Sequence, residues 1–173
     1  LAAGSTTFAG AVAGADGPGE PAGGVRVRAG NLVAFDLGAE EIPALVDEVP
    51  ALAVVATQCA GRTVIAGASE LRVKESDRLA LLARNLRRLG AAVQELDDGL
   101  IIDGPCALRG GGSGDPLVLE TAGDHRIAMA MAVAALCTEG ETALDDGACV
   151  AVSFPGFFGV MSRLLEAGSR PRP

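Results

Sequence analysis

The chain has 173 residues, close to the usual size of one domain, and 49% of them are apolar, which excludes disorder for most of its length. Its 14 basic and 22 acidic residues give a net charge of −8, and a negative surface repels phosphate backbones, so we expect no nucleic-acid partner. The longest apolar run, residues 127–137, is far shorter than the ~20 residues of a spanning helix, so we also expect no membrane partner.

Cysteine and histidine usage argues against metal or redox chemistry. No two of the four cysteines have C-x-x-C spacing, and the chain has one histidine. We expect reduced cysteines, with Cys59 and Cys137 as small core residues of a cytoplasmic protein. No Lys or Arg precedes Arg26, which argues against a secretory signal, and the initial Leu1 indicates that the sequence begins inside a longer chain.

The first half predicts alternating strands and helices. Residues 1–24 are rich in Gly and Ala and are expected to be a loop or the incomplete edge of a domain. Residues 25–28 alternate like a strand, and residues 31–37 are predicted to pair with them. A helix is expected from Ile42 or Asp47 to residue 60, followed by a buried strand at 63–65.

The middle of the chain has the clearest pattern. Leucines at 3, 4 and 3 spacing predict an amphipathic helix over 76–89, and Gly90 is a typical C-terminal cap. Residues 93–96 and 100–102 flank an Asp-Asp-Gly turn and predict a β-hairpin.

The last third predicts a loop or short strand at 115–123 and a helix from a cap at Asp124 to about residue 138. A strand is expected at 142–144. Ser153 is predicted to cap a final helix that has Pro155 in its first turn and ends near residue 167, followed by a frayed tail.

The chain also repeats itself. "ALAVVATQCAGRTVI", ending at Ile65, resembles "AMAVAALCTEGETAL", ending at Leu144, so a unit of apolar helix, glycine, strand and capped helix recurs. The apolar helices of the two copies, at 51–60 and 127–137, lack a polar face. Such helices are typically buried, which predicts helices inside and sheets outside.

Two charged segments interrupt this apolar pattern. Residues 71–79 place three cations and two acids at a helix start, where free N–H groups suit a phosphate or a carboxylate. The alternative is an ordinary cap by Ser76 or Asp77 with solvated charges.

In the second segment, Arg126 lies one turn into an apolar helix, where it needs an anion or a local ion partner. The neighbouring His125 suits proton transfer or a structural role equally well. Asp47 occupies a similar position to Asp124 in the repeat, so both could face one rim, although an isolated Asp there would usually be a helix cap.

Four segments resemble the 5-enolpyruvylshikimate-3-phosphate synthase (3-phosphoshikimate 1-carboxyvinyltransferase) family. They are "EIPALVDEVPALAVVA" (41–56), "ELRVKESDRL" (70–79), "DHRIAMA" (124–130) and "SFPGFF" (153–158). The resemblance implies an α/β fold of two inside-out barrel domains, each with three βαβαββ units, buried helices and outer sheets. It implies transfer of the enolpyruvyl group of phosphoenolpyruvate to the 5-hydroxyl of shikimate 3-phosphate, in the shikimate pathway to chorismate and the aromatic amino acids, without a metal or organic cofactor.

The resemblance also implies roles for individual residues. Asp47 matches the carboxylate that contacts shikimate 3-phosphate and accepts its proton, and Lys74 matches a lysine beside that substrate. Glu75 matches the carboxylate that gives and retrieves the C3 proton. Arg78 and Arg126 match the arginines that clamp phosphoenolpyruvate. His125 matches a histidine beside that clamp, with a less settled role.

The chain departs from the family in two ways. Many relatives have a further Lys where this chain has Val152, and the resemblance implies that these 173 residues match only the second of the two domains. We therefore expect residues 1–24 to be a partial first unit, residues 25–168 the second domain and residues 169–173 a tail. A missing first domain is the expected partner, and the isolated chain is expected not to turn over. The alternatives are a non-catalytic domain and a UDP-N-acetylglucosamine enolpyruvyl transferase.

Overall fold

The computed structural model describes residues 5–12, 22–28 and 30–168 of the chain, so the predicted tail at 169–173 lies outside the described residues. Strands β1 (Ser5–Val12) and β2 (Ala22–Arg28) pair in an antiparallel hairpin. The strand predicted at 25–28 is confirmed. Its predicted pairing with 31–37 is wrong, because β2 forms its backbone hydrogen bonds with β1. The loop expected within residues 1–24 is therefore wrong for the residues of β1.

A four-stranded mixed sheet forms the centre of the described part of the chain. Its order is β3 (Asp36–Leu37), β4 (Gly61–Ile65), β6 (Gly99–Gly104) and β5 (Ala92–Leu96). β3 runs parallel to β4, whereas β6 is antiparallel to both of its neighbours. The predicted hairpin and the predicted strand at 63–65 are therefore confirmed.

The expected helix from residue 42 or 47 to residue 60 is two shorter helices, α1 (Ile42–Leu45) and α2 (Val49–Ala56). Pro50 lies in the first turn of α2. Because proline has no N–H and clashes with the carbonyl of the preceding turn, a helix restarts there rather than continues.

Helix α3 (Arg78–Arg88) follows a 3₁₀ turn at Ser69–Arg72 and carries the predicted apolar stripe. Its leucines are buried against α2, α4 and the sheet, and Gly90 follows it with a φ of +90°. The predicted helix and its glycine stop are confirmed.

The second half of the chain contains helix α4 (His125–Ala135) between two short strands. β8 (Leu117–Leu119) pairs in parallel with β10 (Thr142–Leu144), and β7 (Leu108–Arg109) pairs in parallel with β9 (Thr138–Glu139). The predicted strand at 142–144 is confirmed, whereas α4 ends three residues before the predicted end.

The final helix, α5 (Phe157–Gly168), starts later than predicted. Ser153 ends a 3₁₀ turn at Ala148–Val152 instead of capping α5, so that prediction is wrong. Pro155 disfavours helical backbone at the residue before it, and Gly156 has a low helix propensity, which explains the delayed start.

The predicted repeat is visible in the topology. β3, α2 and β4 form a parallel strand–helix–strand unit, and β8, α4 and β10 form another. In each unit a glycine with positive φ, Gly61 at +110° or Gly140 at +97°, precedes or begins the second strand. With the short α1 and the 3₁₀ turn left out, the elements from β3 to β6 follow the order βαβαββ.

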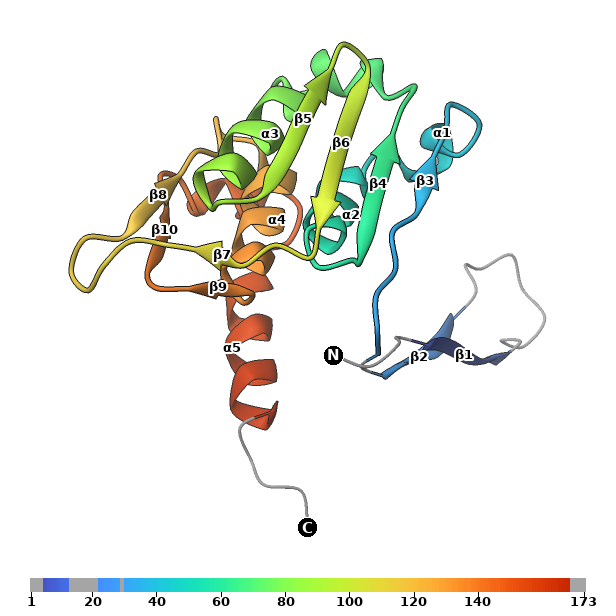
Figure 1. Ribbon diagram of the computed structural model, residues 1–173. Coiled ribbons are helices and arrows are strands. Elements are labelled where there is room, and N and C mark those ends of the chain that lie inside the picture. The colour runs from blue at the N-terminus through green and yellow to red at the C-terminus, as the bar shows by residue number, and fades with distance from the viewer. Residues whose placement is uncertain (1–4, 13–21, 29, 169–173) are drawn as a thin grey trace.

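Helices α2, α3 and α4 lie together on one side of the central sheet (Figure 1). Their buried side chains form one core with β4 and β6. The prediction that the two apolar helices are buried all round is wrong, because Val55 of α2 and Val133 of α4 are exposed, as is Leu136. Cys59 is buried as expected, but Cys137 is exposed, so it is not a core residue. Within the described residues, no helix is long and apolar enough to cross a membrane.

Candidate functional site

The start of α3 places an arginine in the interior. Asp77 caps the helix by accepting a hydrogen bond from the Ala80 amide at 3.0 Å, which confirms one of the two predicted caps. Arg78 is the first helical residue, and only 1% of its side chain is exposed. Glu75 lies in the preceding loop with 52% of its side chain exposed. A buried cation is therefore held next to an accessible carboxylate.

Arg72 fixes that loop against the β5–β6 hairpin. Its guanidinium donates to the Asp77 carboxylate at 2.9 Å, to Glu95 at 3.0 Å and to the Asp97 carbonyl at 2.6 Å. Because these partners come from the cap of α3 and from both the strand and the turn of the hairpin, Arg72 holds the backbone that carries Lys74 and Glu75.

The start of α4 is built around Asp124, whose side chain is completely buried. Its Oδ1 accepts hydrogen bonds from the amides of Arg126 at 2.9 Å and Ile127 at 3.4 Å, so the predicted cap is confirmed. Its Oδ2 accepts from Ser76 Oγ at 2.9 Å and from Arg78 Nε at 2.8 Å. One carboxylate thus joins the starts of α3 and α4.

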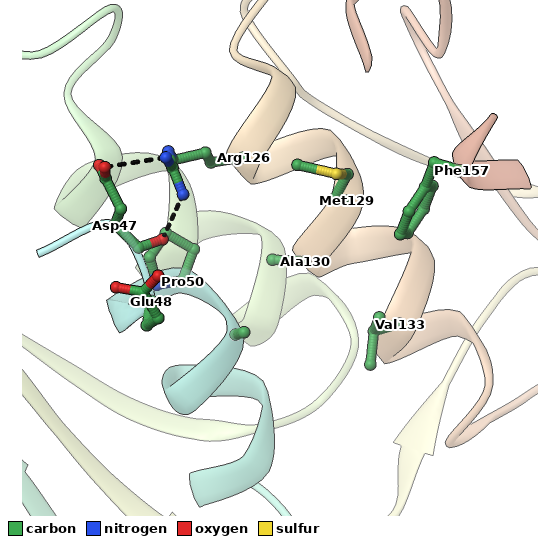
Figure 2. A pocket seen from close by; sticks show the side chains of 9 residues that line it. Asp47, Glu48, Pro50, Arg126, Met129, Ala130, Val133 and Phe157 are labelled. Atoms are coloured by element: carbon green, nitrogen blue, oxygen red, sulfur yellow. Dashed lines mark hydrogen bonds and ion pairs between the residues drawn. The ribbon is translucent and has the colours of Figure 1, made fainter. Parts of the chain in front are cut away.

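Asp47 lies between α1 and α2 but does not cap α2, whose cap position is Glu48 without a side-chain bond. Its Oδ1 lies 3.3 Å from Arg78 Nη1, and its Oδ2 lies 2.8 Å from Arg126 Nη2. Arg126 also donates to the Asp47 carbonyl at 3.1 Å (Figure 2). The prediction that Asp47 caps a helix is therefore wrong. The prediction of a local ion partner for Arg126 is also wrong, because its partner Asp47 is 79 residues away in the chain. Asp47 and Asp124 bind the same arginine, Arg78, but the predicted shared rim is wrong for Asp124, whose side chain is completely buried.

Three carboxylates surround the guanidinium of Arg78: Asp124 at Nε, Asp47 at Nη1 and Glu75 at Nη2. Burial alone would lower the pKa of Arg78, but the bonds and charges of these carboxylates hold the pKa above its ordinary value. Burial likewise acts to raise the pKa of Asp124, yet the bonds from Arg78 and Ser76 keep that pKa below its ordinary value. Both groups are therefore charged at neutral pH.

Two of the predicted site residues lie outside this cluster. Lys74 forms an ion pair with Glu70 on the preceding turn. His125, the half-buried first residue of α4, has no hydrogen bond from its ring to any part of the chain that the structure describes. The structure therefore brings Asp47, Glu75, Arg78 and Arg126 together, but not Lys74 or His125.

The sequence patterns predicted a helix cap at Asp124 and a rim shared with Asp47, and gave Ser76 no role beyond a possible cap. The contacts of Asp124 with Ser76 and Arg78 span more than forty residues of the chain, from the start of α3 to the start of α4, which local patterns do not reveal. The equivalence of Asp47 and Asp124 in the repeat was the one signal that pointed to a common partner.

A hollow of about 270 Å³ adjoins the Asp47–Arg126 pair (Figure 2). Its polar end is the ion pair, and the rest is mostly apolar surface from α2, α4 and α5. The lining residues are Asp47, Glu48, Pro50, Ala51, Arg126, Met129, Ala130, Val133 and Phe157. Among the side chains that the structure describes, no group of three metal-ligating residues is close enough to hold an ion.

The profile of the family described as EPSP synthase (3-phosphoshikimate 1-carboxyvinyltransferase) matches residues 13–161, most of the chain. The chain belongs to the EPSP synthase family. The family segments at Asp47, at 70–79 and at 124–130 are the ones that supply the arginine–carboxylate cluster.

Named relatives agree with this membership. A 3-phosphoshikimate 1-carboxyvinyltransferase of Anaeromyxobacter sp. (strain K) is 53% identical over 154 residues, which cover 88% of this chain and 33% of the relative. That of Gloeobacter violaceus is 50% identical, with 86% and 33% covered. An EPSP synthase structure from Acinetobacter baumannii superposes with a TM-score of 0.75 at 34% identity, over 83% of this chain and 33% of that one. The chain thus spans about a third of the length of the relatives that it matches.

Proposed function

We propose that this chain supplies one wall of the site in which the enolpyruvyl group of phosphoenolpyruvate is transferred to the 5-hydroxyl of shikimate 3-phosphate. The observation that carries the proposal is the cluster of Asp47, Glu75, Arg78 and Arg126 at the family's motif positions. Two guanidinium groups suit a substrate with a phosphate and a carboxylate, and two accessible carboxylates suit proton transfer to and from carbon and oxygen.

The proposed reaction has two steps. The 5-hydroxyl oxygen bonds to C2 of phosphoenolpyruvate while its proton passes to Asp47, and C3 receives a proton from protonated Glu75. Glu75 then removes a proton from C3, the bond from C2 to the phosphate oxygen breaks, and the double bond between C2 and C3 forms again. Phosphate leaves with both electrons of the broken bond and takes up the proton that Asp47 holds, which returns Asp47 to its charged form, so the reaction needs no oxidant or reductant.

The charges of the cluster support the binding of an anionic substrate at the two arginines. Asp47, Glu75 and Asp124 place three negative charges around the two positive charges of Arg78 and Arg126. Asp47 and Glu75 are accessible, with 41% and 52% of their side chains exposed, so an anionic substrate can replace them at the arginines. The displaced carboxylates then lie beside the reacting atoms.

Two further contacts are proposed from the family motifs. Lys74 binds shikimate 3-phosphate after it leaves Glu70, and His125 lies beside the phosphoenolpyruvate clamp. The clamp lacks the lysine that many relatives have at Val152, so Arg78 and Arg126 carry more of its charge.

We propose that residues 25–168 form the greater part of a second domain with the inside-out barrel layout and that residues 1–24 belong to a partial earlier unit. The exposed apolar side chains of Val55, Val133 and Leu136 support this layout, because a further repeat unit could cover them. The β1–β2 hairpin supports an additional unit before β3. The first domain would supply the opposite wall of the site.

A non-catalytic domain, with the family's motifs but without enolpyruvyl transfer, is the second candidate, favoured by the third of the relatives' length that the chain spans. Sites between two domains form when the domains close and exclude water, and one wall cannot do this. The two candidates differ in whether the chain becomes active when the remaining part is supplied.

The test uses this chain combined with the remaining two thirds of the Anaeromyxobacter relative. Glu75→Gln should lower turnover by at least ~100-fold, the scale of general acid–base catalysis, and should abolish deuterium incorporation at C3 in D₂O. Glu139→Gln changes an exposed carboxylate outside both the cluster and the lining of the hollow and is the matched control. Equal turnover of the two variants would contradict the role of Glu75.

A further inference from the structure

We infer that Asp124 is a positioning residue for phosphoenolpyruvate binding: it holds the Nε edge of the Arg78 guanidinium so that Nη1 and Nη2 stay directed at the substrate position. This inference rests on the proposed function. Asp124 itself does not touch the substrate. Its contact with Nε explains how a buried arginine can present its other two nitrogens to a substrate.

The first observation is the difference between the partners of Arg78. The Asp124 carboxylate is completely buried and binds Nε at 2.8 Å, whereas Asp47 and Glu75 are accessible and bind Nη1 and Nη2. An anion that arrives from solvent can replace the accessible partners but not the buried one. Asp124 is therefore the contact that persists when substrate binds.

The second observation is that all the described contacts of the carboxylate are fixed. One oxygen accepts from Ser76 and Arg78, and the other accepts from the backbone amides of Arg126 and Ile127. A carboxylate with four donors from two helix starts has little rotational freedom. It sets the spacing between the two arginines of the cluster, because one is bound by its side chain and the other by its backbone.

The third observation is that the turn before Asp124 is held separately. The Asp145 carboxylate accepts hydrogen bonds from the Thr121 amide at 2.9 Å and the Thr121 hydroxyl at 2.7 Å. The Asp124 amide donates to the Thr121 carbonyl at 3.0 Å. Asp145 therefore supports the same turn without touching Arg78, which makes it a matched control.

The loss of the Asp124 charge should weaken the binding of phosphoenolpyruvate and leave the binding of shikimate 3-phosphate nearly unchanged. Asp124→Asn keeps an oxygen for the cap but removes the charge opposite Nε, so the guanidinium can tilt toward Asp47 and Glu75. Losing a charge-assisted hydrogen bond should raise KM for phosphoenolpyruvate about tenfold or more. KM for shikimate 3-phosphate should change less than threefold, because Asp47 and Lys74 stay in place.

The experiment has two arms. In the chain combined with the remaining part of the relative, both KM values are compared for the unchanged chain, Asp124→Asn and Asp145→Asn. In this chain alone, NMR follows the exchange of the Arg78 Nε proton with water. We expect slow exchange in the unchanged chain and in Asp145→Asn and fast exchange in Asp124→Asn, with KM for phosphoenolpyruvate raised in Asp124→Asn alone.

An unchanged KM for phosphoenolpyruvate in Asp124→Asn, or an equal rise in Asp145→Asn, would overturn the inference. If Asp124→Asn does not fold, Asp124→Glu keeps the charge but moves it by one methylene group, and the same selective rise in KM is expected. If the unchanged combination has no turnover, the proposed function fails, and the proton-exchange arm still decides whether Asp124 holds Arg78. Equal rates of Arg78 Nε proton exchange in Asp124→Asn and Asp145→Asn would then contradict the inference that Asp124 holds Arg78.

Discussion

Asp47 Oδ2 lies 2.8 Å from Arg126 Nη2, although 79 residues separate the two in the chain. The contact joins equivalent regions of the two repeat units, the start of α2 and the start of α4. Both side chains are partly exposed, and the apolar hollow begins beside them. An ion pair in such a position contributes little to stability but is accessible to an anionic ligand.

Arg126→Ala should therefore weaken substrate binding much more than it weakens the fold. We expect the free energy of unfolding to fall by no more than ~1 kcal/mol, the scale of exposed ion pairs. Phosphoenolpyruvate affinity of the combined protein should fall at least tenfold, on the scale of a lost charge-assisted hydrogen bond. Thermal unfolding and isothermal titration measure the two quantities.

Arg62→Ala is the control for Arg126→Ala, because Arg62 forms an exposed two-bond pair with Asp103 on the central sheet. It should leave phosphoenolpyruvate affinity unchanged. A similar loss of affinity in both variants would show that Arg126 has no particular role.

Arg78→Ala should destabilise the chain strongly, because it leaves the carboxylate of Asp124 buried without its charge partner. Removing one member of a buried ion pair costs about 3–5 kcal/mol. Arg84→Ala, on the exposed face of the same helix, should cost no more than ~1 kcal/mol although it also loses an ion pair, with Glu120. Urea unfolding of the two variants gives the comparison, and equal costs would contradict the burial argument.

Acid should destabilise the fold, because the pKa values of two carboxylates are lower in the folded chain than in the unfolded chain. Bonds from Arg78 and Ser76 hold the pKa of Asp124 below its ordinary value against the effect of burial, and bonds from Thr121 do the same for Asp145. A pKa that is lower in the folded state stabilises the fold above the unfolded value of about 3.9, and that stability is lost as the pH falls through the folded pKa.

Urea unfolding at a series of pH values checks this dependence. The free energy of unfolding should fall below about pH 4, and Asp124→Asn should flatten part of that decline. A decline of the same size in Asp124→Asn and in the unchanged chain would show that Asp124 does not contribute.

The cysteines should differ in reactivity. Cys59 is buried behind α2, and burial raises the pKa of its thiol, whereas Cys137 is exposed after α4. Because the thiolate is the reactive form, Cys137 should be labelled by a maleimide much faster than Cys59. Mass spectrometry after brief labelling measures the difference, and Cys137→Ser should remove the fast site alone.

The sequence predicted those elements whose signals are local. Helix α3 has a leucine stripe and a capping aspartate, and the β5–β6 hairpin has an Asp-Asp-Gly turn, so their bounds were predicted to within two residues. Local signals suffice where periodicity and turn chemistry indicate the same structure.

Elements that depend on distant partners were predicted less well. Strand β3 has two residues and forms only because β4 lies beside it, so its partner was wrongly placed on β2. The 3₁₀ turn at Ala148–Val152, which occupies the residues before the expected cap at Ser153, has no periodic signal and was not predicted. Propensity does not decide short segments, because packing against a neighbour outweighs it.

In the candidate site, too, residues with a local sequence signal were predicted and those that depend on distant partners were not. The motifs identified Asp47, Glu75, Arg78 and Arg126, and the fold brings all four together. The central position of Asp124 was not predicted, because its charge partner, Arg78, lies on another helix. A helix cap and a buried ion-pair partner have the same sequence signal, an aspartate before a helix.

Phosphate release from phosphoenolpyruvate and shikimate 3-phosphate is the most direct test of the proposal that this chain is one wall of an enolpyruvyl transfer site. It is measured for the chain alone, for the remaining two thirds of the Anaeromyxobacter relative alone, and for the two combined. The account predicts release only from the combination and only when both substrates are present. Release by the chain alone, or none from the combination, would contradict it.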